Sequence, residues 1–337
     1  MNATMSLENT KHHPVMLNQV LSILSPQHGG TFIDCTFGGG GYSQAILKFP
    51  NTNVVAIDRD ELTKKFADDL LIKFPKRFSF FQEKFSNLGK VVKSNLNPKA
   101  IIFDLGLSSF QLADNKRGFS FDSKNFLNME MGINKYSAYD VINTLEKNHL
   151  ANIIKFLGDE KDARKIASSI VKHRKNKAIK TSEELAFIIQ KAKKRYNTSK
   201  KNPATKTFQA VRIFVNQELT ELILGLIEAT KLLSNGGIIV VVSFHSLEDK
   251  IVKSFFNLYS DQKKNPSRYL PTNEKKINLF NLPLKKPLAP DFNEIEKNAR
   301  SRSAKLRYAL RNKNNFIYPD EFKNKFSNYF ELDREIL

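Results

Sequence analysis

Short apolar runs alternate with amphipathic stretches over the first hundred residues of the chain. The runs lie at residues 31–37, 54–60, 78–82 and 100–106. Their length and nearly continuous apolar character are typical of strands buried on both faces, whereas the stretches between them, such as 60–73, repeat apolar residues at helical spacing. This βαβ rhythm predicts a doubly wound α/β fold with a mostly parallel sheet.

A long helical interval separates these runs from the next strong strand pattern, at residues 236–246. Apolar residues recur at three and four positions in four segments of this interval, which predicts a small inserted helical domain. The segments are 137–145, 149–157, 163–173 and 182–195. The pattern at 205–233 predicts one or two helices that return to the sheet and stop at Gly236 and Gly237.

These patterns predict a division of the chain into three parts. Residues 1–112 and 205–337 form the sheet-containing domain, and residues 113–204 form the helical insertion. After Phe256 the composition shifts to Asn, Pro and Lys, which predicts an extended loop with at most a short strand near Leu282 to Leu288. The alternating segment 303–311 predicts a half-exposed strand at a sheet edge.

The segment DCTFGGGGYS, from Asp34 to Ser43, follows the first apolar run. Its four consecutive glycines, Gly38 to Gly41, allow positive φ angles and leave no Cβ between the main chain and a ligand. Asp58 lies twenty-four positions after Asp34, where a doubly wound sheet places the carboxylate that accepts hydrogen bonds from ribose hydroxyls. The glycine run lacks the G-x-G-x-x-G spacing of pyrophosphate sites and favours S-adenosylmethionine over NAD. The alternative to a cofactor-binding turn is an ordinary strand-to-helix connection that binds no ligand.

Two further strand ends carry polar residues, and ligands of open α/β sheets bind at the carboxyl ends of strands. The fourth run ends in DLGLSSFQLAD, from Asp104 to Asp114, where a simple Ser or Asx turn is the alternative to a binding loop. The fifth ends in SFHSLEDK. There Ser246 is predicted to cap a helix with Asp249 as its capping-box partner, and His245 is either a structural residue or a cleft residue.

Charge points to a polyanionic partner. Lys and Arg number 54 against 34 Asp and Glu, a net charge of +20, and residues 172–206 contain twelve basic residues and two acids. Such clustering favours nucleic acid, although a general compositional bias is the alternative.

The single cysteine, Cys35, excludes an intramolecular disulfide and fits a reducing cytoplasm. No apolar run approaches the ~20 residues of a membrane span, and the histidines show no metal-ligand spacing.

The chain resembles the MraW/RsmH methyltransferases, which transfer a methyl group from S-adenosylmethionine to N4 of a decoding-region cytosine in small-subunit 16S ribosomal RNA. The resemblance runs from His12 to about Arg307. Its motifs, in family order, are DCTFGGGGYS, AIDRD, DLGLSSFQLAD, RGFSF, NPATKTFQAVRIFVNQEL, SFHSLEDKIVK, KPLAP and ARSRSAKLR. The resemblance implies a class I, Rossmann-like S-adenosylmethionine-dependent methyltransferase sheet with an inserted substrate-binding domain.

The resemblance also implies which residues contact the cofactor. They are Gly40, Gly41, Tyr42, Asp58, Phe85, Asp104 and Gln111. The chain departs from the family pattern at several positions. It has Tyr42 in place of the usual histidine, Gln19 in place of an acid, Asn128 and Glu130 within the pattern L-D-M-R-M, and Lys206 where arginine is common. The changes at 128 and 130 alter charge in a loop that we expect near RNA.

Methylation of cytosine N4 needs hydrogen-bond acceptors for the amine, because its lone pair is delocalised into the ring. We expect Asp104 to be the leading acceptor and Ser108 and Ser109 to orient the base. A C5-methylating mechanism would need an attacking cysteine, and Cys35 beside the glycine turn is wrongly placed for it.

The basic helical insertion, including Lys193, Lys194 and Arg195, is predicted to bind the flanking phosphates of ribosomal RNA or of the assembled small subunit. Two other functions remain open: a ribosome-assembly factor with a vestigial cofactor site, and an NAD-linked oxidoreductase. The sequence leaves a homodimer open.

Overall fold

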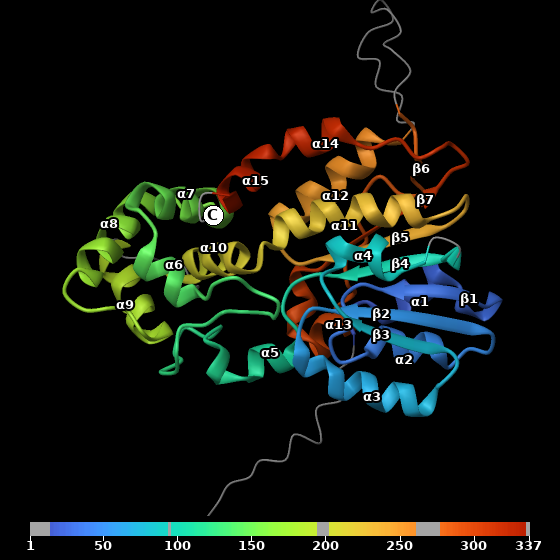
Figure 1. Cartoon of the computed structure of the whole chain (residues 1–337), viewed down its shortest axis with the longest axis horizontal. Coiled ribbons are helices and arrows are strands. Elements are labelled where there is room, and N and C mark those ends of the chain that lie inside the picture. The colour runs from blue at the N-terminus through green and yellow to red at the C-terminus, as the bar shows by residue number, and fades with distance from the viewer. Residues whose placement is uncertain (1–13, 94–95, 194–201, 261–276, 335–337) are drawn as a thin grey trace, which may run out of the picture.

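A seven-stranded sheet forms the centre of the molecule, in the order β3-β2-β1-β4-β5-β7-β6 (Figure 1). Strands β1 to β5 are parallel, and β7 runs antiparallel to β5 and β6. The strands are β1 (Gly30–Asp34), β2 (Thr52–Asp58), β3 (Phe78–Gln82), β4 (Ala100–Asp104), β5 (Ile238–Ser243), β6 (Phe280–Asn281) and β7 (Lys305–Arg311). The predicted doubly wound α/β fold is confirmed.

The computed structural model describes residues 14–93, 96–193, 202–260 and 277–334. Three residues named above, His12, Lys194 and Arg195, lie outside these ranges. Within them, no helix combines the length and apolar character that crossing a membrane requires.

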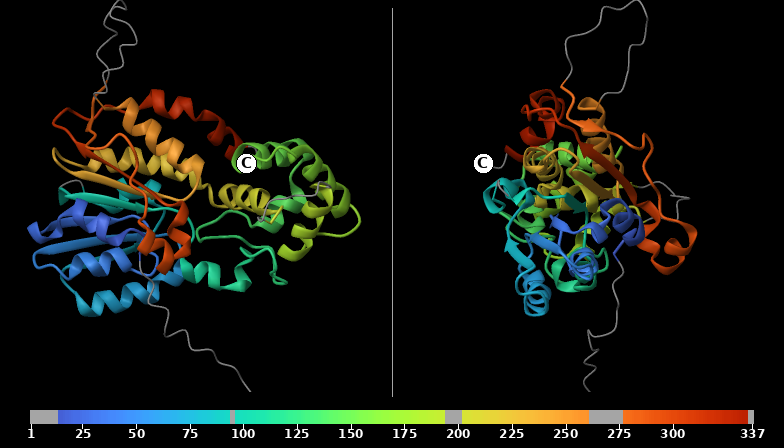
Figure 2. Two further views of the ribbon diagram at one scale, coloured as in Figure 1. Left: turned by 180° about the vertical axis from the view of Figure 1, so that it is seen from behind. Right: turned by 90° about the vertical axis from the view of Figure 1, so that its right-hand side faces the viewer.

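Helices cover both faces of the sheet because neighbouring strand residues point to opposite sides. Ile101 and Phe103 of β4 join one buried cluster, and Ala100 and Ile102 join the other. Helices α4, α11 and α12 pack on the first face and α1 to α3 on the second (Figure 2). These helices are α1 (Leu17–Leu24), α2 (Gly41–Leu47), α3 (Lys64–Lys73), α4 (Leu88–Val91), α11 (Glu218–Leu232) and α12 (Ser246–Leu258).

A second group of helices lies beyond the carboxyl ends of β1 to β5 (Figure 1). Its members are α6 (Ala138–Thr144), α7 (Lys147–Gly158), α8 (Ala163–Arg174), α9 (Ser182–Lys193) and α10 (Thr205–Asn216). Helix α7 packs against α8 and α10, and α8 packs against α9. Arg174 ties this group together, since its guanidinium donates hydrogen bonds to the carbonyl oxygens of Ile142 (2.7 Å) and Leu145 (2.6 Å).

The predicted helical stretch at 205–233 forms two helices, α10 and α11. Gln217 separates them in a left-handed conformation with φ 53°. The predicted stop at Gly236 and Gly237 is too late, because α11 ends at Leu232. Gly236, with φ +83°, instead forms the turn into β5.

Two expectations for the C-terminal strands are wrong in detail. The segment predicted at a sheet edge, now β7, lies between β5 and β6, so β6 is the edge strand. The short strand expected near Leu282 to Leu288 lies earlier, at Phe280–Asn281, and only Leu288 pairs in an isolated bridge with Leu306. Pro283 and Pro287 explain the difference, since proline lacks the N–H that a ladder requires.

The C-terminal helices α14 (Asp320–Lys325) and α15 (Ser327–Arg334) close the structure over α12. Phe322 is fully buried and its ring centroid lies 4.7 Å from that of Phe255 in α12. The hydroxyl of Tyr259 accepts a hydrogen bond from the backbone N–H of Phe322 at 3.1 Å. Helix α15 contacts both α7 and α11, so the C-terminus joins the helical group to the sheet.

Replacing Phe322 with alanine should destabilise the protein by roughly 3–5 kcal/mol, because the change leaves a cavity among packed aromatic rings. Urea unfolding followed by circular dichroism measures this loss. The matched control is Phe292→Ala, which removes the same ring from a residue that is 79% exposed and should change the free energy of unfolding by less than about 0.5 kcal/mol. Equal losses in the two variants would contradict this account of the C-terminal core.

Candidate active site

The glycine turn joins β1 to α2 and faces open space at its centre. Gly38 and Gly40 have φ of 54° and 77°, the left-handed region that disfavours residues with a Cβ. A Cβ on Gly40 would lie 2.8 Å from the Phe37 ring, and one on Gly41 would lie 2.2 Å from Pro14. Gly39 has no heavy atom within 4 Å of its Cβ position. The turn is therefore packed on both sides and leaves room for a ligand in the middle.

Asp58, the predicted ribose acceptor, ends β2 beside this turn. Its carboxylate accepts hydrogen bonds from the backbone N–H groups of Gly38 (2.7 Å) and Asp60 (2.9 Å). Burial raises the pKa of Asp58 to about 6, against the lowering effect of these two bonds. The same side chain thus holds the glycine turn in place and offers a carboxylate at the strand end.

Asp34 is a second buried carboxylate at this edge, at the end of β1. It accepts hydrogen bonds from the Ser43 hydroxyl (2.7 Å) and the Thr36 N–H (3.3 Å). Burial raises its pKa to about 6. We did not select Asp34 as a site residue from the sequence, although it opens the glycine motif.

Asp104, at the end of β4, is the third carboxylate. Its backbone N–H donates to the Thr36 hydroxyl at 2.6 Å, and its Oδ1 atom is buried with no hydrogen-bond partner among the described residues. Burial is the largest of the effects that raise its pKa well above the ordinary value, followed by the charges of Asp34, Glu248 and Glu294. A buried acceptor without a partner is costly, so a donor or cation supplied by a ligand would fit here.

Gln111 lies in a network around a fourth acid, Asp60. The Gln111 side chain donates to Asp60 at 2.7 Å and accepts from the backbone N–H of Ser108 at 2.9 Å. Arg117 of the RGFSF motif also donates to the Asp60 carboxylate and reaches the carbonyl of Glu130 at 2.8 Å. Sequence reasoning missed the role of Asp60, because its partners lie 51 and 57 positions away.

The remaining predicted cofactor residues have protein partners. The hydroxyl of buried Tyr42 donates to the carbonyl of Val15. Phe85 packs edge-on against Phe103, with ring centroids 5.4 Å apart, and lies so close to Gly225 of α11 that a Cβ there would be 2.5 Å from the ring. The structure therefore gives Phe85 a packing role beside any contact with a ligand.

The loop after Asp104 leads into the short helix α5 (Ser109–Ala113). Ser108 caps this helix and its hydroxyl accepts from the Gln111 N–H at 3.3 Å, as the turn alternative requires. Ser109 receives a hydrogen bond from the Arg300 guanidinium. Arg300 is a site neighbour that sequence reasoning missed, since it lies 191 positions away.

The predicted capping pair at the fifth strand end is wrong by one residue. His245, not Ser246, is the N-cap of α12, and Glu248 is its capping-box partner. The Glu248 carboxylate accepts from the backbone N–H groups of Phe244 (2.8 Å) and His245 (3.2 Å). Asp249 instead pairs with Lys305 and Arg307. Asp249 remains in the first turn of α12 but contacts β7, and Glu248, the more usual residue type, completes the capping box.

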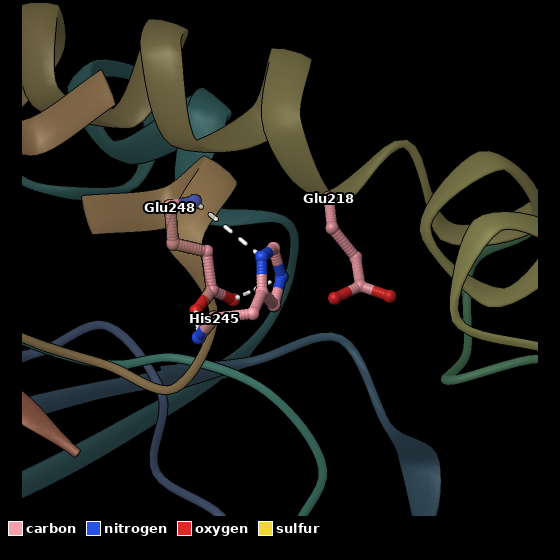
Figure 3. Close-up of side chains that lie close together, drawn as sticks. All are labelled: Glu218, His245 and Glu248. Atoms are coloured by element: carbon pink, nitrogen blue, oxygen red, sulfur yellow. Dashed lines mark hydrogen bonds and ion pairs between the residues drawn. The ribbon is translucent and has the colours of Figure 1, made fainter. Parts of the chain in front are cut away.

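Figure 3 shows Glu218, His245 and Glu248 with their side chains close together. One potential ligand atom from each lies within 4.8 Å of the others. Arg212 donates hydrogen bonds to both oxygens of Glu218, at 2.7 and 2.8 Å, and His245 Nε2 lies 3.1 Å from Glu248. Arg212 thus pairs with both oxygens of Glu218, and the three side chains form a polar junction between α10, α11 and α12.

The fold brings most of the predicted site residues to one edge of the sheet. The glycine turn, the acid Asp58 after β2 and the loop after Asp104 surround the same strand ends. A buried carboxylate cluster suits a ligand that carries positive charge and hydroxyl donors, as S-adenosylmethionine does with its sulfonium, ammonium and ribose groups. Fold and site together define a class I S-adenosylmethionine-dependent methyltransferase.

Comparison with known proteins agrees. The chain belongs to the MraW methylase family, whose sequence profile matches residues 9–312. Proteins named ribosomal RNA small subunit methyltransferase H are 46% identical in Wolbachia sp. subsp. Drosophila simulans (88% of this chain, 97% of that protein) and 46% identical in Ehrlichia canis (89% and 99%). A solved rRNA methylase from Streptococcus thermophilus, 10% identical over 90% of this chain and 100% of its own, has a TM-score of 0.42 and is too distant to inform function.

We expect the affinity for S-adenosylmethionine to fall as the pH drops below about 6. The pKa of Asp58 and of Asp34 is raised to about 6 in the free protein, so both carboxyls are largely protonated at pH 5. Hydroxyl and cationic donors favour the ionised form, and each proton that must leave costs up to about tenfold in affinity per pH unit. Calorimetric titrations between pH 5 and 8 measure this.

Asp58→Asn should weaken binding at pH 7.5 and flatten the pH dependence, because the amide does not titrate. Asp68→Asn is the matched control on the exposed side of α3 and should keep the wild-type profile. An affinity that is constant down to pH 5 in the unmodified protein would contradict the raised pKa values.

Proposed function

We propose that the protein transfers a methyl group from S-adenosylmethionine to N4 of a decoding-region cytosine in 16S ribosomal RNA of the small subunit. The observation that carries this proposal is Asp104, whose buried Oδ1 atom has no hydrogen-bond partner in the part of the chain that the structure describes and lies at the strand end beside the glycine turn. Relatives 40–46% identical to this chain are named ribosomal RNA small subunit methyltransferase H, which supports small-subunit RNA as the substrate.

The cofactor residues in this proposal are those that the resemblance implied. Asp58 holds the ribose, and Gly40, Gly41 and Tyr42 shape the turn around the ligand. Phe85 and Gln111 flank it from the third strand end and from α5. The bound cofactor supplies an electrophilic methyl group on a positively charged sulfur.

The Asp104 carboxylate accepts a hydrogen bond from an N–H group of the cytosine amine, and this bond increases the electron density on N4. When bound, S-adenosylmethionine would supply the methyl group to N4, and the electron pair of its broken C–S bond would stay on sulfur. The amine proton then passes to Asp104, which must be ionised for this step. Positive charge bound beside it lowers the pKa of Asp104 toward its ordinary value. Ser108 and Ser109, at the start of α5, orient the base.

In the proposed division, residues 113–204 supply the main RNA contact and residues 1–112 and 205–337 form the catalytic domain, whose helix α10 packs against α7 of the helical part. Lys172 and Lys175 at the end of α8 are exposed, as phosphate contacts require. Lys193 has a different role, because its ammonium bonds Glu160 at 2.6 Å and the carbonyl of Pro203 at 2.9 Å. In this proposal the enzyme acts in the cytoplasm on ribosomal RNA or the assembled subunit.

A cofactor-binding assembly factor without transfer is the second candidate, and one assay separates the two. Unmodified small subunits and free 16S RNA are incubated with labelled S-adenosylmethionine, and the digested RNA is analysed by nucleoside mass spectrometry. N4-methylcytidine is expected. Cofactor binding without transfer to either substrate would favour the assembly factor, and a different methylated nucleoside would refute the proposed atom.

Asp104→Asn should lower the rate of methyl transfer by about 10²–10⁴-fold at saturating cofactor, because the amide cannot take up the amine proton. Cofactor affinity should change far less than the rate. Single-turnover assays with the substrate identified above measure the step, with Asp68→Asn as the control. A variant that retains the wild-type rate would remove Asp104 from the mechanism.

A further inference from the structure

The stretch 297–311 carries six basic residues and no acid. Three of them have protein acceptors. Lys305 and Arg307 bond Asp249 at 2.9 and 2.7 Å, and the buried guanidinium of Arg311 bonds backbone carbonyls at 2.6 to 3.2 Å. These residues belong to β7, and their charges are used within the fold.

The other three, Lys297, Arg300 and Arg302, are exposed. No described carboxylate lies within ion-pair distance of any of them, and the hydroxyl of Ser109 is the side-chain acceptor of Arg300. Half-buried arginines elsewhere in the chain, such as Arg59 and Arg212, each donate at least two hydrogen bonds to protein oxygens. The stretch 297–302 therefore presents three exposed cations that no carboxylate of the described residues neutralises.

This cationic stretch is fixed at the candidate active site. It spans the end of α13 (Phe292–Lys297) and the 3-10 helix η6 (Ala299–Ser303), which pack together. The Glu294 carboxylate accepts a hydrogen bond from the backbone N–H of Met16 beside the glycine turn. Arg300 reaches the loop after Asp104 through Ser109, and Figures 1 and 2 show α13 at this end of the sheet. Two anchors thus hold the segment beside the position proposed for the target base.

The segment also carries an aromatic ring. Phe292, the first residue of α13, is 79% exposed. An exposed ring and exposed guanidinium groups on one segment form a combination by which proteins bind unpaired nucleotides, since bases stack on the ring and phosphates bind the cations. The target base must leave its stack to reach the methyl group, so its neighbours become available for such contacts.

We propose that residues 292–302 form a second RNA contact, which binds the single-stranded nucleotides flanking the target cytosine. Arg300 and Arg302 bind the phosphates, and Phe292 stacks on a neighbouring base. This inference rests on the proposed function and adds a contact on the catalytic domain, separate from the helical part. Because the Arg300 guanidinium also donates a hydrogen bond to Ser109, it connects the bound phosphate to the loop that orients the target base.

The test measures RNA affinity of the full chain as a function of salt, with a single-stranded 16S fragment containing the target. The double variant Arg300→Ala/Arg302→Ala should lower the slope of log affinity against log salt by about 1.4, which is two phosphates at about 0.7 each. The loss of affinity relative to the unmodified protein should therefore be about 25-fold larger at 0.1 M salt than at 1 M salt. The matched control, Lys73→Ala/Lys76→Ala at the opposite edge of the sheet, removes the same charge from exposed positions and should leave the slope unchanged.

Phe292→Ala should lower the affinity about fivefold or more without changing the salt slope, because stacking releases no counterions. Unchanged affinity would overturn the stacking contact, and an unchanged slope in the double arginine variant would overturn the phosphate contact. All variants should bind S-adenosylmethionine normally, which shows that the site is folded. If the unmodified chain neither binds nor methylates this RNA, the proposed function itself fails. If it does both and the variants match it, the second contact alone fails.

Discussion

The proposed cofactor site depends on the buried aspartates that lie where the parallel strands end. Asp34, Asp58 and Asp104 each end a parallel strand, and burial raises the pKa of all three. Such a cluster is unfavourable in a free protein unless its members take up protons or receive donors. Backbone N–H groups and hydroxyls supply part of this need. In the proposed function the positive charge of S-adenosylmethionine supplies the rest.

The acid edge is also joined to the helical part of the molecule. Arg59 follows Asp58 directly and donates hydrogen bonds to the carbonyls of Gly132 (2.5 Å), Asn216 (2.6 Å) and Ile133 (3.1 Å). Asn216 ends α10, which packs against α7. The residue next to the proposed ribose acceptor therefore orders the loop between the two parts. Asn128 and Glu130, where the chain departs from its family, lie in this region and bond each other at 2.9 Å.

Sequence reasoning worked where one local signal sets the outcome. Strands β1 to β5 follow from short buried apolar runs, and the position of Asp58 beside the glycine turn follows from its spacing. Prediction from the sequence failed where a hydrogen-bond partner is distant along the chain, or where two adjacent residues compete for the same role. The acceptor of Arg117 lies 57 positions away, and Arg300 meets Ser109 across 191 positions. At α12 the pattern predicted Ser246 as the cap with Asp249 as its partner, whereas His245 and Glu248 form the capping box and Asp249 pairs with Lys305 and Arg307, which are distant in the sequence.

The most direct test of this account is a carbon-13 NMR titration of the aspartate carboxyl groups in the free and S-adenosylmethionine-saturated protein, with signals assigned through single Asp→Asn variants. The account predicts that Asp34 and Asp58 titrate near pH 6 when free, well above the ordinary aspartate value, and that both midpoints fall when the cofactor binds. Midpoints near 4 in the free protein, unchanged by the cofactor, would contradict the claim that buried carboxylates make this edge a site for a cationic ligand.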